Sequence, residues 1–416
     1  MQQPIVIVGG GLAAGSAAKT LRQEGYDGPL TIIAAERREP YLRPPLSKEF
    51  LKGQEKEADL LVNPSGWYEK NDVDLRLGER AAQIIPGAHM LRLESEALVP
   101  YSKLLLATGA QPRALDIPGA QLEGVHSLRR LEDSLALREE LAGGGRRVVI
   151  VGSGWIGLEV AAAAREYGNE VTVLGRHASV LRQLEGPLAE VFRRALEAEG
   201  VQFRLPAHPV EFVAAADREC VAGTVLNTGE RIGADLVLVA VGVEPDTALA
   251  EEARLRLRDG ILTDASLRTS AEDIFAAGDV ASSLQPRTGD HVRSEHWSNA
   301  LNGGKVAAKA MLGADAQLDI APYFYTDQAG LSMEYSGFGQ LVRGAHLVLR
   351  GRIDTPEAAK EGFVALWVRD GAVVGGMNVN TPRQQKAIKA LIASRAPVDE
   401  ARLRDPAVPL PELAGV

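Results

Sequence analysis

Ile5-Val6-Ile7-Val8-Gly9-Gly10-Gly11-Leu12-Ala13-Ala14-Gly15 is the stretch that decides the fold. Its apolar, mostly β-branched start predicts a buried parallel strand, and the glycines predict a tight turn into a helix. In this context, Gly9, Gly11 and Ala14 form the G-x-G-x-x-A fingerprint of a dinucleotide site. Gly9 allows the turn, Gly11 lets the backbone approach a pyrophosphate, and Ala14 lets helix and strand pack closely. We expect the pyrophosphate to bind the free amides at the positive end of the helix dipole.

The same pattern recurs at residues 148–159, Val-Val-Ile-Val-Gly-Ser-Gly-Trp-Ile-Gly-Leu-Glu. The glycines are Gly152, Gly154 and Gly157, with Trp155 and Ile156 between the last two. Two fingerprints predict two dinucleotide sites. A tightly held flavin dinucleotide and a diffusible nicotinamide one are the pair expected, because together they make a hydride-transfer unit.

The residue that follows each fingerprint's next strand distinguishes the two sites. Glu36 ends the strand predicted from Leu30, where a carboxylate can hold both ribose hydroxyls; the alternative is a solvated strand-end acid. The second site instead has Arg176, His177 and Arg182. Arginine receives a 2′-phosphate by charge-assisted bonds, whereas a carboxylate repels it. We therefore expect NADPH; the alternative is that both arginines face solvent and NADH binds through backbone contacts.

Three further stretches are candidates for ligand contacts. The residues 104–112 and 235–245 echo each other, each an apolar strand, a small-residue turn and then a proline, which indicates repetition of a whole nucleotide-binding module. The proline-rich loop at 39–48 could place cations near phosphate and flavin; alternatively it is a rigid surface turn before a short helix that starts at Ser47. Asp279 could accept a hydrogen bond from the ribityl chain of a flavin or cap the next helix.

Bulk properties exclude several classes of protein. The chain has 416 residues and a net charge of −9, which argues against nonspecific nucleic-acid binding. No stretch approaches the roughly 20 apolar residues of a membrane span. No secretory signal precedes Ile5, so a cytoplasmic location is expected. The single cysteine, Cys220, excludes an intrachain disulfide and any mechanism that needs a redox-active cysteine pair. No metal site is predicted.

These features predict an α/β fold with two Rossmann-like dinucleotide-binding domains, for FAD and NAD(P), and a C-terminal α+β domain. The expected boundaries are 1–111 with 236–320 for the discontinuous FAD domain, 112–235 for the NAD(P) domain and 321–416 for the C-terminal domain. Four strands are expected in the last domain (331–338, 346–350, 363–369 and 373–379), then a helix at about 382–394 and a proline-rich tail. Cations on that helix are a candidate dock for an acidic partner.

Five motifs in order resemble a known family: the first fingerprint, Pro-Tyr-Leu-Arg-Pro-Pro-Leu-Ser-Lys at 40–48, Ala-Thr-Gly at 107–109, the second fingerprint with its glutamate, and Ile-Phe-Ala-Ala-Gly-Asp at 274–279. This order resembles the FAD-dependent ferredoxin reductases that serve Rieske dioxygenases and cytochrome P450 systems (putidaredoxin reductase-like, in the glutathione-reductase structural superfamily). The resemblance implies electron transfer from NADPH or NADH through FAD to a small acidic iron–sulfur ferredoxin. It leaves a homodimer open.

The resemblance also implies roles for individual residues. Lys48 lies at the N5 side of the flavin and pairs with Glu159, and both are expected to be catalytic. Glu159 also contacts the nicotinamide amide. The complete set of residues expected to bind FAD or the nicotinamide nucleotide is Gly9, Gly11, Ala14, Glu36, Arg43, Lys48, Arg80, Ala81, Ala107, Thr108, Gly109, Arg113, Gly152, Gly154, Trp155, Ile156, Gly157, Glu159, Arg176, His177, Arg182, Ala240, Val241, Gly242, Gly278, Asp279, Glu295, His296, Trp297 and Tyr325.

Three departures from the family pattern leave alternatives open. The chain has Phe-Tyr-Thr-Asp-Gln at 324–328 where the family often has Phe-Trp-Ser-Asp-Gln; Tyr325 can still stack on the flavin, but the acceptor is in doubt. Residues 295–297 also differ, and the arginines after the second fingerprint resemble NADPH-dependent glutathione reductase. The alternatives are a reductase of a small acceptor, such as a quinone, oxygen or ascorbate radical, and a signalling flavoprotein like apoptosis-inducing factor.

Overall fold

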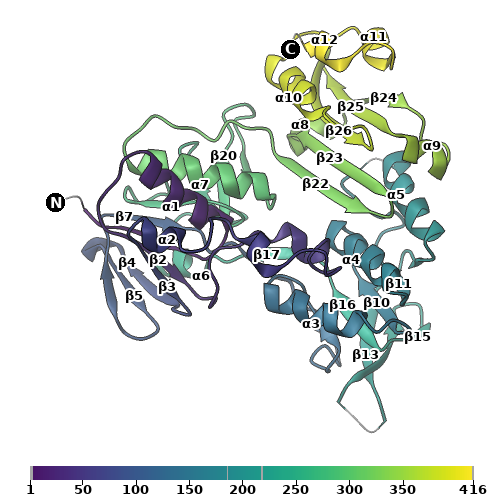
Figure 1. The fold of residues 1–416 in the computed structure, drawn as a ribbon, viewed down its shortest axis with the longest axis horizontal. Coiled ribbons are helices and arrows are strands. Elements are labelled where there is room, and N and C mark those ends of the chain that lie inside the picture. The colour runs from purple at the N-terminus through teal and green to yellow at the C-terminus, as the bar shows by residue number, and fades with distance from the viewer. Residues whose placement is uncertain (1–2, 185, 217–218, 415–416) are drawn as a thin grey trace. The chain divides into compact units, whose positions relative to one another are not determined.

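The computed structural model of the chain describes residues 3–184, 186–216 and 219–414. The chain forms two compact units, each built from segments that are far apart in the sequence (Figure 1). The first unit comprises Met1–Arg43, Lys56–Gln111 and Glu244–Tyr323; the second comprises Pro44–Glu55, Pro112–Val243 and Phe324–Val416. The proline-rich loop at 39–48 is thus divided between the two units after Arg43. The three domains expected from the sequence stay a prediction.

The first unit is built on a five-stranded parallel sheet whose order is β19-β7-β1-β2-β3. Its strands are β1 (Ile5–Val8), β2 (Leu30–Ala34), β3 (Val73–Leu77), β7 (Lys103–Leu106) and β19 (Ile274–Ala276). Helices α1 (Leu12–Gln23) and α7 (Trp297–Met311) pack side by side (Figure 1). Strands β4 (Ala81–Ile85), β5 (Met90–Leu93) and β6 (Leu98–Pro100) form an antiparallel sheet, in which β4 and β5 make a hairpin around Pro86.

Strand β1 is apolar throughout because both faces of the sheet are covered. Ile5 and Ile7 belong to the core formed with α1 and α7. Val6 and Val8 point to the opposite side, into a core with residues of β4, β5 and α6 (Ala248–Glu252). Successive side chains of a strand alternate between faces, so a strand buried on both sides lacks polar positions. This explains the continuous apolar run that opens the sequence.

The second unit repeats this topology. Its parallel sheet has the order β12-β11-β10-β16-β9, with the fingerprint strand again at the centre. The strands are β9 (Val125–His126), β10 (Arg147–Val151), β11 (Glu170–Leu174), β12 (Gln202–Arg204) and β16 (Leu236–Val239). Helices α3 (Leu131–Leu141), α4 (Trp155–Glu166) and α5 (Gly186–Ala198) accompany them, and β13 (Pro209–Ala214), β14 (Val221–Leu226) and β15 (Arg231–Gly233) form an antiparallel sheet. The repeat of whole modules predicted from the sequence is confirmed.

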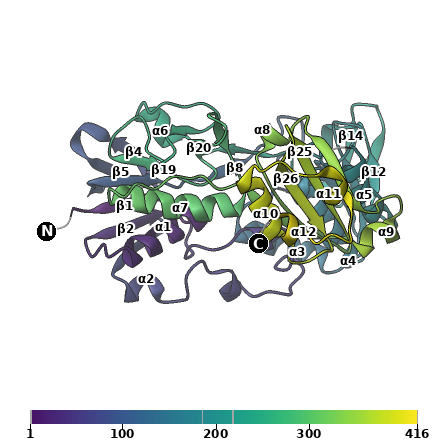
Figure 2. The ribbon, with the colours of Figure 1, turned by 90° about the horizontal axis from the view of Figure 1, so that it is seen from above.

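The C-terminal part of the second unit is an antiparallel sheet of order β22-β23-β26-β25-β24. Its strands are β22 (Tyr323–Gln328), β23 (Leu331–Gly337), β24 (His346–Gly351), β25 (Phe363–Arg369) and β26 (Ala372–Val379). Helix α10 (Gln385–Ser394) packs on β26 (Figure 2). The predicted fold class, two Rossmann-like modules and a C-terminal α+β part, is confirmed. Strand β22 was missed because Tyr323, Tyr325 and Asp327 alternate with Phe324, Thr326 and Gln328, so neither face is clearly apolar.

The remaining elements are short. The strands are β8 (Ala110–Pro112), β17 (Val243–Pro245), β18 (Ile261–Thr263), β20 (Ala281–Leu284) and β21 (His291–Arg293). The helical turns are η1 (Pro44–Ser47), η2 (Glu57–Leu60), α2 (Trp67–Lys70), η3 (Pro86–Ala88), α8 (Gly339–Val342), α9 (Pro356–Glu361), α11 (Glu400–Arg404) and α12 (Leu410–Ala414).

One local prediction was wrong. The short helix expected to start at Ser47 instead begins at Pro44 and ends at Ser47. Proline is favourable in a first helical turn because that turn needs no N–H donor there. The proline-rich tail holds the two short helices α11 and α12. Among the helices of the described residues, none combines the length and apolar character that crossing a bilayer requires.

Candidate active site

The two outer glycines of the first fingerprint have different environments. Gly9 has a φ of +132°, and a Cβ there would lie 2.1 Å from the carbonyl oxygen of Ala107. Gly11 is the N-cap of α1, and a Cβ there would have no atom within 4 Å. No side chain caps this helix end. The open space and uncapped amides fit the pyrophosphate of a dinucleotide, because such amides bind anions.

Other expected FAD ligands of the first unit lie near this turn or pair with one another. Glu36 accepts a hydrogen bond from Tyr41 Oη (2.5 Å) and one from Arg43 Nη2 (2.6 Å). The strand-end carboxylate is therefore held in place rather than solvated. A Cβ on Gly278, next to Asp279, would lie 3.3 Å from Ala13 Cβ, which places this turn beside the start of α1.

The Ala107-Thr108-Gly109 turn is fixed by its own hydrogen bonds. The Thr108 hydroxyl donates to the carbonyl of Asp246 at 2.7 Å, and Gly109 has a positive φ of 76°. Ala14 is fully buried against the sheet, as the fingerprint predicts. Arg80 pairs with Glu94 at 3.3 Å on the surface, and Ala81 opens β4. Their expected contact with FAD stays a prediction.

The segment 295–297 lies at the start of α7. Glu295 pairs with Arg293 at 2.6 Å, and His296 is the N-cap residue of the helix. Burial lowers the pKa of His296 to about 4, and the nearby Asp279 opposes this shift only in part. The imidazole is therefore neutral at working pH. Trp297 makes an edge contact with Tyr323, with ring centroids 6.1 Å apart.

The second fingerprint reproduces the first in detail. Gly152 has a φ of +124°, and a Cβ there would lie 2.2 Å from the carbonyl oxygen of Ala240. This contact brings the small-residue turn at Ala240-Val241-Gly242 against the glycines, and Gly242 accepts a backbone hydrogen bond from Arg113. Gly154 is an uncapped N-cap with open space around it. Ile156, on the first turn of α4, is 43% exposed, which fits a residue that a nucleotide covers.

The basic segment after β11 lies beside this second turn. The amide of Leu181 donates to the carbonyl of Ser153 at 3.0 Å, which ties the segment to the fingerprint. Arg176, His177 and Arg182 are exposed, and Arg182 Nη1 lies 3.4 Å from His177 Nε2. The segment is therefore positioned to meet the ribose end of a nucleotide bound at α4.

Lys48 and Glu159 form a buried ion pair within the second unit, with Lys48 Nζ 2.8 Å from Glu159 Oε2. Both side chains are at most 5% exposed. Glu159 lies one helical turn beyond Trp155 on α4, and Lys48 follows η1. The hydroxyl of Ser134 on α3 donates to the carbonyl of Leu46 at 2.7 Å and thereby anchors η1. The pairing that the resemblance implied is present in the structure.

Tyr325 extends this cluster from strand β22. The Lys48 ammonium lies 5.5 Å from the centre of its ring. Burial and nearby carboxylates raise the pKa of Tyr325 to about 12, so the phenol stays protonated. Two residues that also hold Glu159 were missed from the sequence, Ser47 and Thr326. Ser47 adjoins Lys48 in the proline-rich motif, and this adjacency was the available signal.

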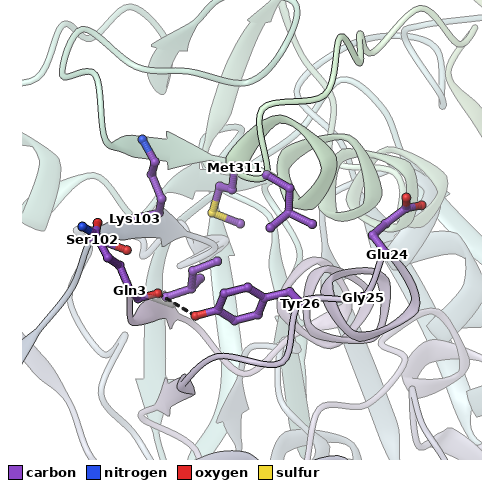
Figure 3. Close-up of a pocket in the computed structure, with 9 residues that line it drawn as sticks. Gln3, Glu24, Gly25, Tyr26, Ser102, Lys103 and Met311 are labelled. Carbon is purple, nitrogen blue, oxygen red and sulfur yellow. Dashed lines mark hydrogen bonds between the residues drawn. The ribbon is translucent and has the colours of Figure 1, made fainter. Parts of the chain in front are cut away.

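A surface hollow of about 440 Å³ lies elsewhere on the first unit (Figure 3). Its lining includes Tyr26, Lys103 and Met311, and none of the predicted site residues. Its charged groups are already paired: Lys103 with Asp273, and Glu24 with Lys309. The hollow therefore offers no evident charge for a ligand.

Comparison with known proteins identifies the family. Residues 3–304 match the family described as pyridine nucleotide-disulphide oxidoreductase, and residues 323–414 match the family described as reductase C-terminal. The chain belongs to the pyridine nucleotide-disulphide oxidoreductase family. The family resemblance inferred from the motifs is confirmed.

Named relatives align along almost the whole chain. The ferredoxin–NAD(+) reductase component of the anthranilate 1,2-dioxygenase system of Burkholderia cepacia is 38% identical, over 98% of this chain and 98% of that protein. A rubredoxin–NAD(+) reductase of Pseudomonas putida is 35% identical, over 92% and 97%. The structure is similar to that of the reductase in the covalent putidaredoxin reductase–putidaredoxin complex, with a TM-score of 0.94, 29% identity and coverage of 100% and 98%.

Proposed function

We propose that this chain is a flavoprotein reductase that passes electrons from NAD(P)H through FAD to a ferredoxin-type iron–sulfur protein. The observation that carries the proposal is the buried pair of Lys48 with Glu159, which lies on the helix that follows the second uncapped glycine turn. The family and the dioxygenase-system reductase that is 38% identical support it, and they imply FAD and NAD(P)H as cofactors.

Different residues of the chain bind FAD and the nicotinamide nucleotide. The turn at Gly9 and Gly11 binds the pyrophosphate of FAD, and Glu36 with Arg43 fixes its adenosine end. The turn at Gly152 and Gly154 binds the nicotinamide nucleotide. FAD, when bound, accepts two electrons together and can release them singly. In this proposal, residues 1–111 with 236–320 hold FAD, and residues 112–235 hold NAD(P)H.

Lys48 supplies a fixed positive charge for the flavin ring. Such a preorganised charge stabilises negative charge that develops during reduction, and it acts strongly in a site from which water is excluded. Glu159 keeps the ammonium in one position. The chain has one cysteine, so it cannot relay electrons through a cysteine pair, which is consistent with direct transfer to an external acceptor.

The experiment that tests this function is anaerobic mixing of the holoenzyme with a reduced nicotinamide nucleotide. Bleaching of the flavin absorbance, followed by reduction of a small iron–sulfur ferredoxin at a useful rate, is the expected result. Efficient turnover with quinones but not with any ferredoxin would instead favour the small-acceptor alternative. Slow reoxidation with a nucleotide-dependent change in oligomeric state would favour the signalling alternative.

The preferred nucleotide in this proposal is NADPH. Arg176 and Arg182 are exposed beside the second turn, where a 2′-phosphate would meet them. Each charge-assisted bond contributes about 1.5–3 kcal/mol, or about tenfold to a hundredfold in affinity. The named relatives carry NAD(+) in their names, so this preference is a point on which the chain would differ from them.

Replacing Arg176 or Arg182 with alanine tests the preference. We expect kcat/KM for NADPH to fall about tenfold for each change, because one phosphate contact is lost. The value for NADH should stay unchanged, and it serves as the internal control in steady-state assays. Faster flavin reduction by NADH than by NADPH in the unaltered enzyme would contradict the proposal.

The proposed docking surface for an acidic ferredoxin is the basic face at α10, made of Lys386 and Lys389 on the helix and of Arg383 and Arg395 just beyond its two ends. All four are at exposed positions. Opposite charges on two partners accelerate encounter and fix orientation. The acidity of the partner is part of this proposal.

Charge reversal of the basic face tests the docking surface. The double change Arg383→Glu with Lys386→Glu should raise the KM for ferredoxin about tenfold, since two attractive contacts become repulsive. Reduction of the flavin by NADPH should not change. Arg231→Glu, at an exposed position on β15, is the matched control. An unchanged KM in the double variant would mean that ferredoxin binds at another surface.

A further inference from the structure

A chain of buried polar groups leads from the C-terminal sheet to the Lys48–Glu159 pair. Thr326 Oγ1 lies 2.7 Å from Glu159 Oε1, and Gln328 Nε2 lies 3.1 Å from Thr326 Oγ1. The other carboxylate oxygen, Oε2, accepts from Ser47 Oγ at 2.5 Å and from Lys48 Nζ at 2.8 Å. All five side chains are buried.

The direction of these hydrogen bonds follows from the chemistry of the groups. A carboxylate paired with lysine can only accept hydrogen bonds, so the single proton of the Thr326 hydroxyl points to Glu159. The lone pairs of that hydroxyl then face Gln328, which must present its N–H. The Gln328 Oε1 atom is buried, and it has no hydrogen-bond partner among the described residues. Gln328 thus makes its donor contact to Thr326 although its carbonyl is left without a partner.

The contact between β22 and α4 keeps this arrangement in register. Trp155 and Glu159 are four residues apart, so they lie on one face of the helix, about 6 Å apart along its axis. Phe324 and Thr326 are two residues apart, so they lie on one face of the strand. The distance between them along the strand, about 6.6 Å, is nearly the same. The rings of Trp155 and Phe324 lie 5.2 Å apart, and Thr326 meets Glu159 at the next position.

We propose that Thr326 and Gln328 are positioning residues for the electron-transfer reaction: they hold the Glu159 carboxylate in one orientation and thereby fix the Lys48 ammonium. This proposal rests on the proposed function, in which Lys48 acts on the flavin. The C-terminal part, which has no nucleotide motif, thereby contributes directly to the geometry of the reductase site.

The physical reason is the asymmetry of the carboxylate's partners. Ser47 and Lys48 both bind Oε2, so Thr326 is the contact that holds Oε1. Without it, Oε1 becomes a buried acceptor with no donor, and the carboxylate can turn to regain one. The ammonium of Lys48 would then follow its partner and leave the position that serves the flavin.

The test compares Thr326→Val, which removes the hydroxyl but keeps the shape, with Thr326→Ser, which keeps the hydroxyl. In the holoenzyme, Thr326→Val should slow flavin reduction by NADPH about tenfold, as expected for one lost contact to a charged group. It should also lower the flavin midpoint potential by about 30 mV, the equivalent of a tenfold change in a two-electron equilibrium. Thr326→Ser should match the unaltered enzyme in both measurements.

The matched control is Thr224→Val on β14. Thr224 is also buried, and its hydroxyl donates to the carbonyl of Glu211 at 3.0 Å, away from Glu159. This variant should keep the midpoint potential and the rate. Gln328→Leu removes the donor to Thr326 and should shift both quantities in the same direction by less, so the proposal stays testable if Thr326→Val does not fold.

A second background separates a positioning role from a general packing role. In Glu159→Ala, adding Thr326→Val should shift the potential no further, because Thr326 acts through Glu159. A full additional shift in that background, an unchanged potential in Thr326→Val, or a shift in Thr326→Ser as large as in Thr326→Val would each overturn the inference. If the unaltered enzyme holds no FAD or is reduced by neither nucleotide, the proposed function itself fails.

Discussion

His296 carries a consequence for stability at the scale of a single residue. Its side chain lies partly buried at the start of α7, and desolvation lowers its pKa from 6.5 to about 4. Between these two values, the unfolded chain binds a proton that the folded chain does not. Stability therefore decreases as the pH falls from 6.5 to 4, and the contribution of this residue is complete above 6.5.

The loss over this window should amount to about 3 kcal/mol. We predict that His296→Gln removes most of this pH dependence, since glutamine does not titrate. Urea unfolding of both proteins at several pH values between 4 and 7 measures it. Parallel curves for the unaltered protein and His296→Gln would contradict the prediction.

The burial of the Lys48–Glu159 ion pair does not by itself mean that the pair stabilises the fold. Burying two charges costs solvation free energy that their attraction repays only when the geometry and hydrogen bonds are good. Three donors around the Glu159 carboxylate meet that condition. Such a pair is weak evidence of a stabilising role, so its burial is better explained by the position it gives to Lys48.

At the scale of an element, each glycine turn contains two kinds of glycine, which differ in backbone conformation and in the space around them. Gly9 and Gly152 have positive φ values and lie against a neighbouring backbone carbonyl. Gly11 and Gly154 are in extended backbone that any residue adopts, and the space where their Cβ atoms would lie is open. The first kind serves the fold, and in the proposed function the second kind lies against the ligand.

This distinction predicts different effects of alanine at the two positions. Gly9→Ala should destabilise the protein by about 3 kcal/mol or more, through a backbone clash and an unfavourable φ. Gly11→Ala should change stability by less than about 1 kcal/mol and weaken FAD binding about tenfold or more, because the methyl group occupies the space of the pyrophosphate. Thermal unfolding and fluorescence titration with FAD measure the two effects.

The second turn provides the control for this pair. Gly154→Ala should retain FAD and raise the KM for the nicotinamide nucleotide, since it changes the other dinucleotide site. Loss of FAD from Gly154→Ala, or full FAD affinity in Gly11→Ala, would show that the open space at these positions is not where the pyrophosphates bind.

At the scale of the whole molecule, the single cysteine sets this chain apart from the disulphide chemistry in the name of its family. Cys220 is free and half-buried, and it precedes β14. No second cysteine exists anywhere in the 416 residues, so no disulfide can form within the chain and take up electrons. The reductive half of the reaction must therefore end on the bound cofactor.

We predict that Cys220→Ser leaves both flavin reduction and ferredoxin reduction unchanged. Alkylation of the thiol should have no effect on turnover either, because the thiol takes no part in electron transfer. Stopped-flow and steady-state assays before and after alkylation measure this. A large loss of activity in the serine variant would mean that the thiol participates in the reaction.

Local residue order was enough to predict the two modules and the glycine turns that open their helices. A strand, a glycine turn and a helix are contiguous, so local residue order predicts the first site, Gly9 to Ala14, and the second, Gly152 to Gly157. The repeated topology could be inferred for the same reason, since the strand, turn and helix that open each module are contiguous.

Only the tertiary structure decided which residues surround Glu159. More than a hundred positions in the sequence separate Glu159 from Ser47, Thr326 and Gln328. Folding brings these residues together because η1, α4 and β22 pack against one another. Hydroxyl and amide side chains are common on exposed strands and turns, so nothing local marks Thr326 as a buried partner of the carboxylate or Gln328 as the partner of Thr326. Their role depends on packing between distant segments, which no spacing or composition encodes.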